Sequence, residues 1–112
     1  MKKYLILFPV YNDWASLWKL SKEINERVQS LDAKFSFLFI NDASNEKRPD
    51  FNLNLEKIDS VKVINIKKNQ LSGRCIATGL KYIYENEKFD YVIVMDSDGE
   101  DKPECIIDIH NK

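Results

Sequence analysis

The sequence predicts an α/β domain of three layers, in which a mostly parallel sheet of about four strands lies between helices. Continuous apolar runs alternate with helical patterns along the chain, as strands buried on both faces alternate with their crossover helices. Three glycines and three prolines are too few for a turn-rich β sandwich. The 112 residues fit one domain, and 44% hydrophobic residues can form its core.

The first half of the chain predicts two strands around one helix. Residues 4–8 form an apolar run that ends at Pro9, which predicts a buried strand. Apolar residues then recur at steps of three and four over residues 17–31, which predicts an amphipathic helix. A second strand is expected over residues 35–40, and a polar loop over residues 45–59. Five aromatic residues of this half are expected in the core: Trp14, Trp18, Phe35, Phe37 and Phe39.

The second half predicts two further strands, each followed by a helix. Residues 61–66 form the third apolar run, and Gly73 is expected to open the next helix. Its inward face is expected to consist of Ile76, Ala77, Leu80, Ile83 and Tyr84. Residues 91–95 predict the fourth strand, and Pro103 suits the first turn of a last helix.

Composition excludes several classes of protein. Seventeen basic residues against eighteen acidic ones give a net charge of −1, which argues against binding to nucleic acid or to an anionic membrane surface. Two cysteines, Cys75 and Cys105, provide neither a disulfide framework nor a metal-ligand spacing. No G-x-G-x-x-G follows the first strand, which excludes a dinucleotide-binding oxidoreductase domain. The simplest interpretation is a reduced, cytoplasmic, globular domain.

Polar clusters follow all four predicted strands, at residues 9–13, 41–44, 67–69 and 96–98. Ligands of parallel α/β sheets bind outside the carboxyl ends of the strands. The clusters therefore predict one binding site on one edge of the sheet.

Asp96 and Asp98 are the candidate metal ligands at this edge. Two carboxylates two residues apart can hold Mg²⁺ or Mn²⁺ together with phosphate oxygens, since these hard cations prefer oxygen ligands. The alternative is a turn or helix-capping role, because Asp-Gly is a common turn dipeptide and Gly99 follows Asp98.

Other side chains at the edge suit the organic part of a ligand. Asp42 could accept a hydrogen bond from a pyrimidine N–H or a ribose hydroxyl, or could instead close an Asx-turn. Arg74 lies in the first turn of a predicted helix and could hold phosphate or stack near a base. Tyr11 could stack on a base or pack half-buried, whereas Lys67 and Lys68 are more simply solvated loop charges.

Four segments resemble the motifs of family 2 glycosyltransferases with the GT-A fold. Residues 9–13 (PVYND) resemble a P-V-Y-N-E opening, and residues 40–44 (INDAS) resemble V-D-D-G-S. Residues 69–80 (NQLSGRCIATGL) resemble N-x-G-x-x-x-A-x-x-x-G-L. Residues 94–104 (VMDSDGEDKPE) are close to V-M-D-A-D-x-Q-D-P-P-E of members that use polyprenyl-phosphate acceptors. The motifs stand in the family's order and cover nearly the whole chain.

The resemblance implies a Rossmann-like GT-A nucleotide-binding fold and the transfer of a sugar from a nucleotide-diphosphate sugar, with a polyprenyl phosphate as a candidate acceptor. It implies that Asp98 contacts the metal and the diphosphate, that Asp96 contacts the ribose or the metal shell, and that Asp42 contacts the base. The nucleotide pocket is expected to include Pro9, Tyr11 and Asn12, and by a looser correspondence Arg74.

The chain also departs from the family pattern. Asp13, Asn41 and Ala43 replace the usual Glu, Asp and Gly. Family catalytic domains are longer, and their second half brings the acceptor site and the acidic catalytic base, for which no residue of this chain is a candidate. Residues 1–112 are therefore expected to form the N-terminal, donor-binding part of a GT-A domain. That part would work with a C-terminal half or as a homo-oligomer, at the cytoplasmic face of a membrane in a full-length form. The alternative is a catalytically incomplete nucleotide-binding module or truncated remnant.

Overall fold

The computed structural model describes residues 2–12, 14–42, 55–66, 72–86 and 89–95, with the backbone alone at residues 42, 72–76 and 86. Four strands and two helices lie within these ranges. Their bounds in chain order are β1 Lys2–Val10, α1 Trp14–Arg27, β2 Ala33–Asp42, β3 Ile58–Ile66, α2 Ser72–Asn86 and β4 Tyr91–Val94.

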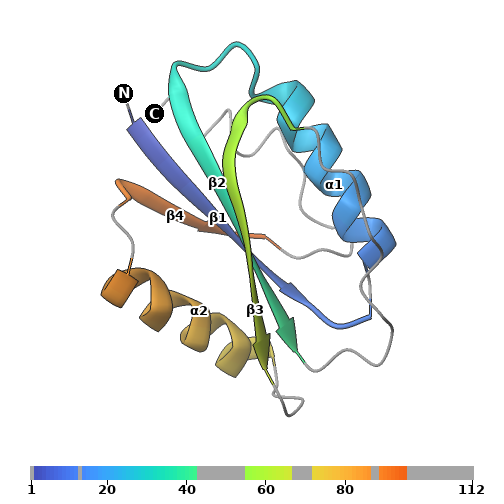
Figure 1. The fold of residues 1–112 in the computed structure, drawn as a ribbon, viewed down its shortest axis with the longest axis vertical. Coiled ribbons are helices and arrows are strands. Elements are labelled where there is room, and N and C mark those ends of the chain that lie inside the picture. The colour runs from blue at the N-terminus through green and yellow to red at the C-terminus, as the bar shows by residue number, and fades with distance from the viewer. Residues whose placement is uncertain (1, 13, 43–54, 67–71, 87–88, 96–112) are drawn as a thin grey trace.

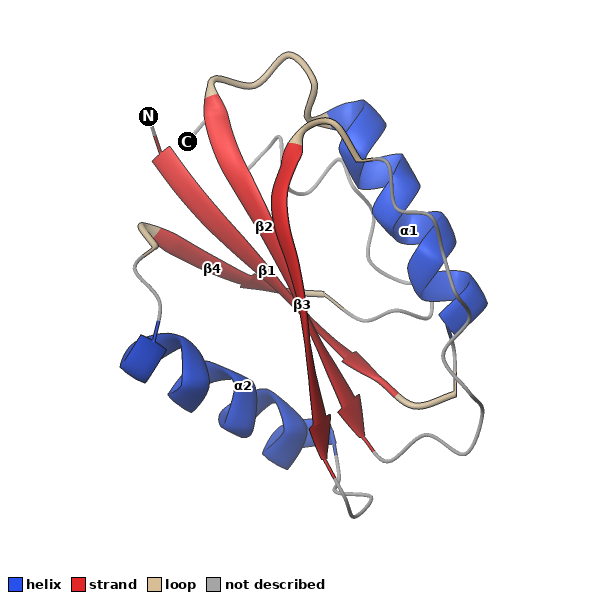
Figure 2. Cartoon of the chain, in the orientation of Figure 1, coloured by secondary structure: helices blue, strands red, loops and turns tan. Residues whose placement is uncertain are grey.

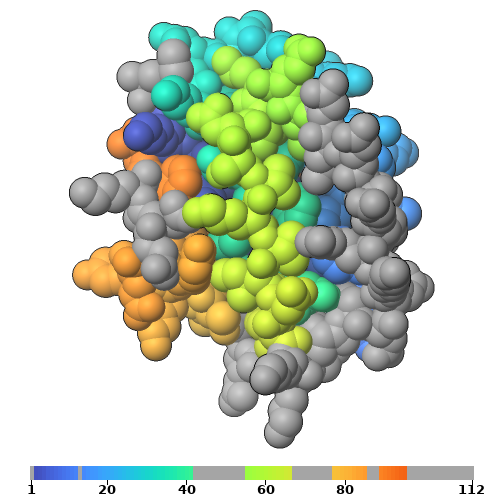
Figure 3. Space-filling view, in the orientation of Figure 1, coloured from blue at the N-terminus to red at the C-terminus, as the bar shows by residue number. Residues whose placement is uncertain are grey.

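The four strands form one sheet in the order β3-β2-β1-β4, and every neighbouring pair is parallel. Helix α1 covers one face of the sheet and α2 covers the other (Figure 1, Figure 2). The predicted fold class, an α/β sheet of about four parallel strands between helices, is therefore confirmed. In Figure 3 the atoms of β3 form a continuous band on the visible surface, as expected of a strand at the edge of the sheet.

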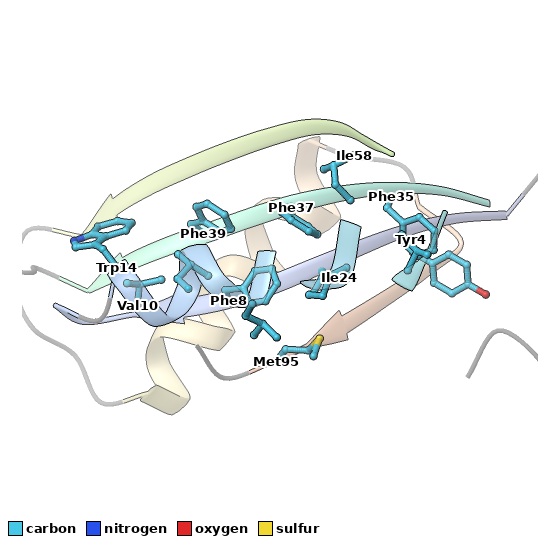
Figure 4. Close-up of a cluster of buried hydrophobic side chains, with 14 of the residues drawn as sticks. Tyr4, Phe8, Val10, Trp14, Ile24, Phe35, Phe37, Phe39, Ile58 and Met95 are labelled. Carbon is cyan, nitrogen blue, oxygen red and sulfur yellow. The ribbon is translucent and has the colours of Figure 1, made fainter. Parts of the chain in front are cut away.

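The larger core lies between the sheet and α1. It is rich in aromatic rings because alternate residues of β1 and β2 point to this face (Figure 4). The ring of Phe8 meets Phe37 edge to face at 5.3 Å and Phe39 at 5.5 Å. Four of the five aromatic residues predicted for the core are buried there, and Trp18 is only half-buried.

The smaller core lies between the sheet and α2. Leu5, Leu7, Leu38 and Ile40 of the sheet pack with Ile83 of the helix. The residues of β1 that face α2 are thus the odd-numbered ones, and those that face α1 are the even-numbered ones. A strand covered on both faces reads as a continuous apolar run, which explains the pattern in the sequence.

The inward face predicted for the second helix is wrong at three positions. Ala77, Leu80 and Tyr84 are exposed, and Tyr84 is 90% exposed. A Cβ atom on Gly79 would lie only 2.7 Å from Leu7 Cδ1, so the helix makes its closest approach to the sheet at this glycine. The predicted inward face was centred on Leu80, the next residue after Gly79. Successive residues of an α-helix are about 100° apart around its axis, so contact at Gly79 turns the predicted face away from the sheet by about that angle.

Three element boundaries also differ from the predictions. Strand β1 continues through Pro9 to Val10, and α1 ends at Arg27, although Val28 and Leu31 still pack on the core. Strand β3 starts at Ile58, inside the predicted loop, because Ile58 pairs with Phe35 of β2. The last helix, predicted after Pro103, lies outside the described residues. Neither α1 nor α2, the helices of the described part, is long and apolar enough to span a membrane.

Candidate functional site

The candidate site lies at the edge of the sheet where the parallel strands end. Strand β1 ends at Val10, β2 at Asp42, β3 at Ile66 and β4 at Val94. The connection from β1 to β2 passes over one face through α1, and the connection from β3 to β4 passes over the other face through α2. The described connections that leave β1 and enter β4 therefore pass over opposite faces, which makes the junction of these two strands the topological switch point where such sheets bind ligands.

Pro9 lies where β1 and β4 stop pairing. The carbonyls of Lys3 and Leu7 accept hydrogen bonds from Asp90 N at 2.9 Å and Met95 N at 3.0 Å. Odd-numbered residues of β1 thus direct their backbone N–H and C=O groups toward β4. The odd-numbered residue after Leu7 is Pro9, which has no N–H to donate to β4. Pairing with β4 ends one step earlier, at Leu7 opposite Val94. On its other side β1 stays paired with β2 beyond Pro9, so the strands part only at the switch point.

Tyr11 and Asn12 follow β1 at this junction. The Tyr11 side chain is 41% exposed, which suits a ring that stacks on a ligand better than one packed in the core. Asn12 has a φ of 58°, in the left-handed region that asparagine tolerates better than most residues. This conformation redirects the chain from β1 toward the start of α1.

Asn41 and Asn65 join the ends of β2 and β3. Asn41 Nδ2 donates a hydrogen bond to Asn65 Oδ1 at 3.0 Å, between directly paired residues of the two strands. Sequence reasoning missed Asn65, which lies within the third apolar run. The strand register would have been needed to find it, because only pairing places it opposite Asn41.

The described residues include part of the predicted site. The backbone of Asp42 ends β2, paired with Ile66, and the backbone of Arg74 lies in the first turn of α2. The side chains of both residues lie outside the description. Asp96 and Asp98, the predicted metal ligands, also lie outside it, immediately beyond the end of β4. Lys67 and Lys68 are likewise not described.

No group of three or more His, Cys, Asp or Glu side chains within the described ranges could hold a metal ion. The one described group with a clearly shifted pKa is Tyr4, where burial, with Tyr91 and Asp90 nearby, raises the pKa above its ordinary value of 10.0. Tyr4 lies at the start of β1, away from the carboxyl ends of the strands.

Comparison with known proteins identifies the family. The model of glycosyl transferase family 2 matches residues 5–111. The chain belongs to this family. The uncharacterized glycosyltransferase YkcC of Bacillus subtilis (strain 168), a curated relative, is 27% identical over 111 residues. The match covers 98% of this chain and 33% of YkcC, so the chain spans about a third of the length of that relative.

Family membership agrees with the resemblance seen in the four sequence motifs. The all-parallel sheet with helices on both faces agrees with the Rossmann-like GT-A fold that the resemblance implies. Three of the four motifs begin within the last three residues of a described strand, and the motif at residues 69–80 begins three residues after β3.

Proposed function

We propose that the chain forms the donor-binding part of a glycosyltransferase that uses a nucleotide-diphosphate sugar. The observation that carries the proposal is that all four described strands are parallel and end at one edge, and that the motif segments lie at or just after these ends in the sequence. Family membership over residues 5–111 supports glycosyl transfer as the chemistry. The site is proposed to bind the nucleotide at the switch point between β1 and β4.

The nucleoside is proposed to bind between the ends of β1 and β2. Pro9, Tyr11 and Asn12 are proposed to form one wall, where the exposed Tyr11 would stack on the base. Asp42, at the last position of β2, is proposed to accept a hydrogen bond from the base or ribose. Arg74 is proposed to attract the phosphates, because the first turn of a helix already favours an anion.

Asp96 and Asp98 are proposed to hold the divalent cation. Their carboxylate oxygens are the donor set that Mg²⁺ or Mn²⁺ prefers, and in the sequence they come shortly after the end of β4. The bound ion would act as a Lewis acid that neutralises the diphosphate leaving group. Asp98 is assigned to the metal and diphosphate, and Asp96 to the metal shell or the ribose.

A polyprenyl phosphate is the proposed acceptor. The support is the resemblance of residues 94–104 to family members that use such acceptors. Activity would also require an acceptor site and a catalytic base, for which this chain has no candidate. We therefore propose that the 112-residue chain binds donor nucleotide but does not transfer sugar alone. Robust turnover of labelled nucleotide sugars with polyprenyl phosphate would contradict this part.

Calorimetry with UDP and GDP, with and without Mn²⁺, tests the donor site. Asp98→Asn should remove the part of the affinity that depends on Mn²⁺, because it removes an anionic ligand. Asp42→Ala should weaken binding with and without metal by about 1–3 kcal/mol, the scale of a hydrogen bond to a charged group. Asp59→Asn is a matched control, since Asp59 is exposed near the start of β3, at the opposite edge of the sheet.

The outcomes separate the assignments. If Asp98→Asn and the wild type bind nucleotide equally in Mn²⁺, the metal assignment is wrong. If Asp42→Ala binds normally, Asp42 has only a turn role. If the wild type binds neither nucleotide, the donor-site proposal itself is wrong.

A further inference from the structure

The indole N–H of Trp14 is a buried donor without an acceptor. The side chain is only 3% exposed, and Nε1 has no hydrogen-bond partner. No other described side chain has such an atom. A buried polar group that loses its hydrogen bond to water without replacement destabilises the fold, so an orphaned donor needs an explanation.

Trp14 lies at the proposed nucleotide site. It is the first residue of α1 and follows Asn12 by two positions. In Figure 4 its ring lies beside Val10, at the end of the sheet where the strand arrows terminate, and the indole nitrogen points away from Ile24 and the rest of the core. The orphaned donor is therefore directed toward the edge at which the ligand is expected to bind.

We propose that Trp14 Nε1 donates a hydrogen bond to a neutral oxygen of the nucleoside, either a base carbonyl or a ribose hydroxyl. This inference rests on the donor site proposed above. The surroundings favour a neutral acceptor over a phosphate, because Trp14 belongs to the apolar cluster that includes Val10 and Phe39. A phosphate brought against one neutral donor among apolar groups would lose more hydration than this hydrogen bond returns. The helix dipole at the N-terminal end of α1 adds a weak preference for the partly negative oxygen of a carbonyl or hydroxyl group.

The apo protein is then less stable than its core would allow. The atom Nε1 is enclosed, so the acceptor reaches it only when the atoms that cover it shift. Trp14→Phe keeps an aromatic ring and removes the orphaned donor. This substitution should lower nucleoside affinity. It should cost the apo protein less stability than the removal of a hydrogen-bonded indole would, because no hydrogen bond within the protein is lost. Such an exchange of stability for binding is typical of functional sites.

Nuclear magnetic resonance of the ¹⁵N-labelled indoles tests the inference on the wild-type chain. Trp14 and Trp18 give two indole signals, and a Trp18→Phe variant assigns them. On saturation with uridine, guanosine, UDP or GDP, the Trp14 indole proton should move downfield as it gains an acceptor. The Trp18 ring is only half-buried and lies under Lys22 at 5.3 Å, so its signal is the internal control. A Trp14 signal that does not move at saturation overturns the inference.

Titration of Trp14→Phe provides the second measurement. A neutral hydrogen bond lost from the complex should lower the affinity for the nucleoside and for the nucleotide by the same factor, roughly 3- to 10-fold. Binding of inorganic pyrophosphate should not change. Equal affinity of the variant and the wild type, or a loss seen only with pyrophosphate, overturns the assignment and leaves the donor site standing. A wild type that binds none of the nucleosides or nucleotides refutes the donor site and this inference together.

Discussion

Gly79 sets how closely α2 approaches the sheet, and replacing it with alanine tests the packing directly. A Cβ atom at this position would lie 2.7 Å from Leu7 Cδ1, 3.1 Å from Leu7 Cδ2 and 3.2 Å from Ile40 Cδ1. The shortest of these distances requires a neighbour to move. Both neighbours are completely buried, so their side chains have little room in which to rotate.

Two opposing terms determine the effect of Gly79→Ala. Alanine in a helix is favoured over glycine by about 1 kcal/mol. Insertion of a methyl group into a packed core costs about 1–3 kcal/mol. We expect a net loss of about 0–2 kcal/mol in the free energy of unfolding.

Truncation of Leu7 removes the two shortest of these contacts, so Gly79→Ala should then stabilise the protein instead of destabilising it. Leu7→Ala alone should cost about 2–5 kcal/mol, as for other buried leucines. In that background Gly79→Ala should stabilise the protein by up to about 1 kcal/mol, because the helix preference then outweighs the remaining 3.2 Å approach to Ile40 Cδ1. The double-mutant cycle should thus give a coupling free energy of about 1–3 kcal/mol.

Urea denaturation followed by circular dichroism measures all four proteins of the cycle. Ala77→Gly on the exposed side of α2 calibrates the helix preference and should cost about 1 kcal/mol. If Gly79→Ala has the same effect with Leu7 and with Ala at position 7, the glycine is not a packing requirement and the reasoning fails.

Three further predictions concern other parts of the fold. The raised pKa of Tyr4 means that the folded chain holds this proton more tightly, so stability should be full below pH 10.0 and fall as the pH rises through the folded pKa. Alkaline urea titrations should show a smaller fall for Tyr4→Phe. Asn12 has a φ of 58°, so Asn12→Ala should lower the free energy of unfolding by about 1–2 kcal/mol and Asn12→Gly by less. Thermal unfolding measures both variants, and equal midpoints would contradict the prediction. Strand β4 ends the described sheet with Val92 exposed, so sedimentation at rising concentration should detect self-association that Val92→Lys reduces.

The sequence was sufficient for the fold class because β1 and β2, the two central strands, are covered on both faces. Residues 4–8 form a continuous apolar run since even positions face α1 and odd positions face α2. The same physics could not predict the rotation of α2. Its apolar residues cover a broad part of the helix surface. The helix contacts Leu7 at Gly79, where no side chain keeps the two apart, and the apolar pattern does not show this.

The candidate site was predictable only in part, for a related reason. Residues that follow a strand could be assigned to one edge once the strands were known to be parallel, and the positions of Tyr11 and Asn12 after β1 were predicted in this way. Asn65 could not be found, because it lies inside an apolar run and meets Asn41 only through the register of β2 and β3. Trp14 was predicted as a core residue, which its burial confirms.

Trp14 illustrates why burial and function are not exclusive interpretations of one residue. Its ring contributes apolar area to the α1 core, which a phenylalanine would also provide. The indole N–H contributes nothing to that core and is left without an acceptor at the edge where four strands end. A group that weakens the apo fold at the place where a ligand is expected is explained if the ligand supplies the acceptor. The same polar atom would remain unexplained if Trp14 served the core alone.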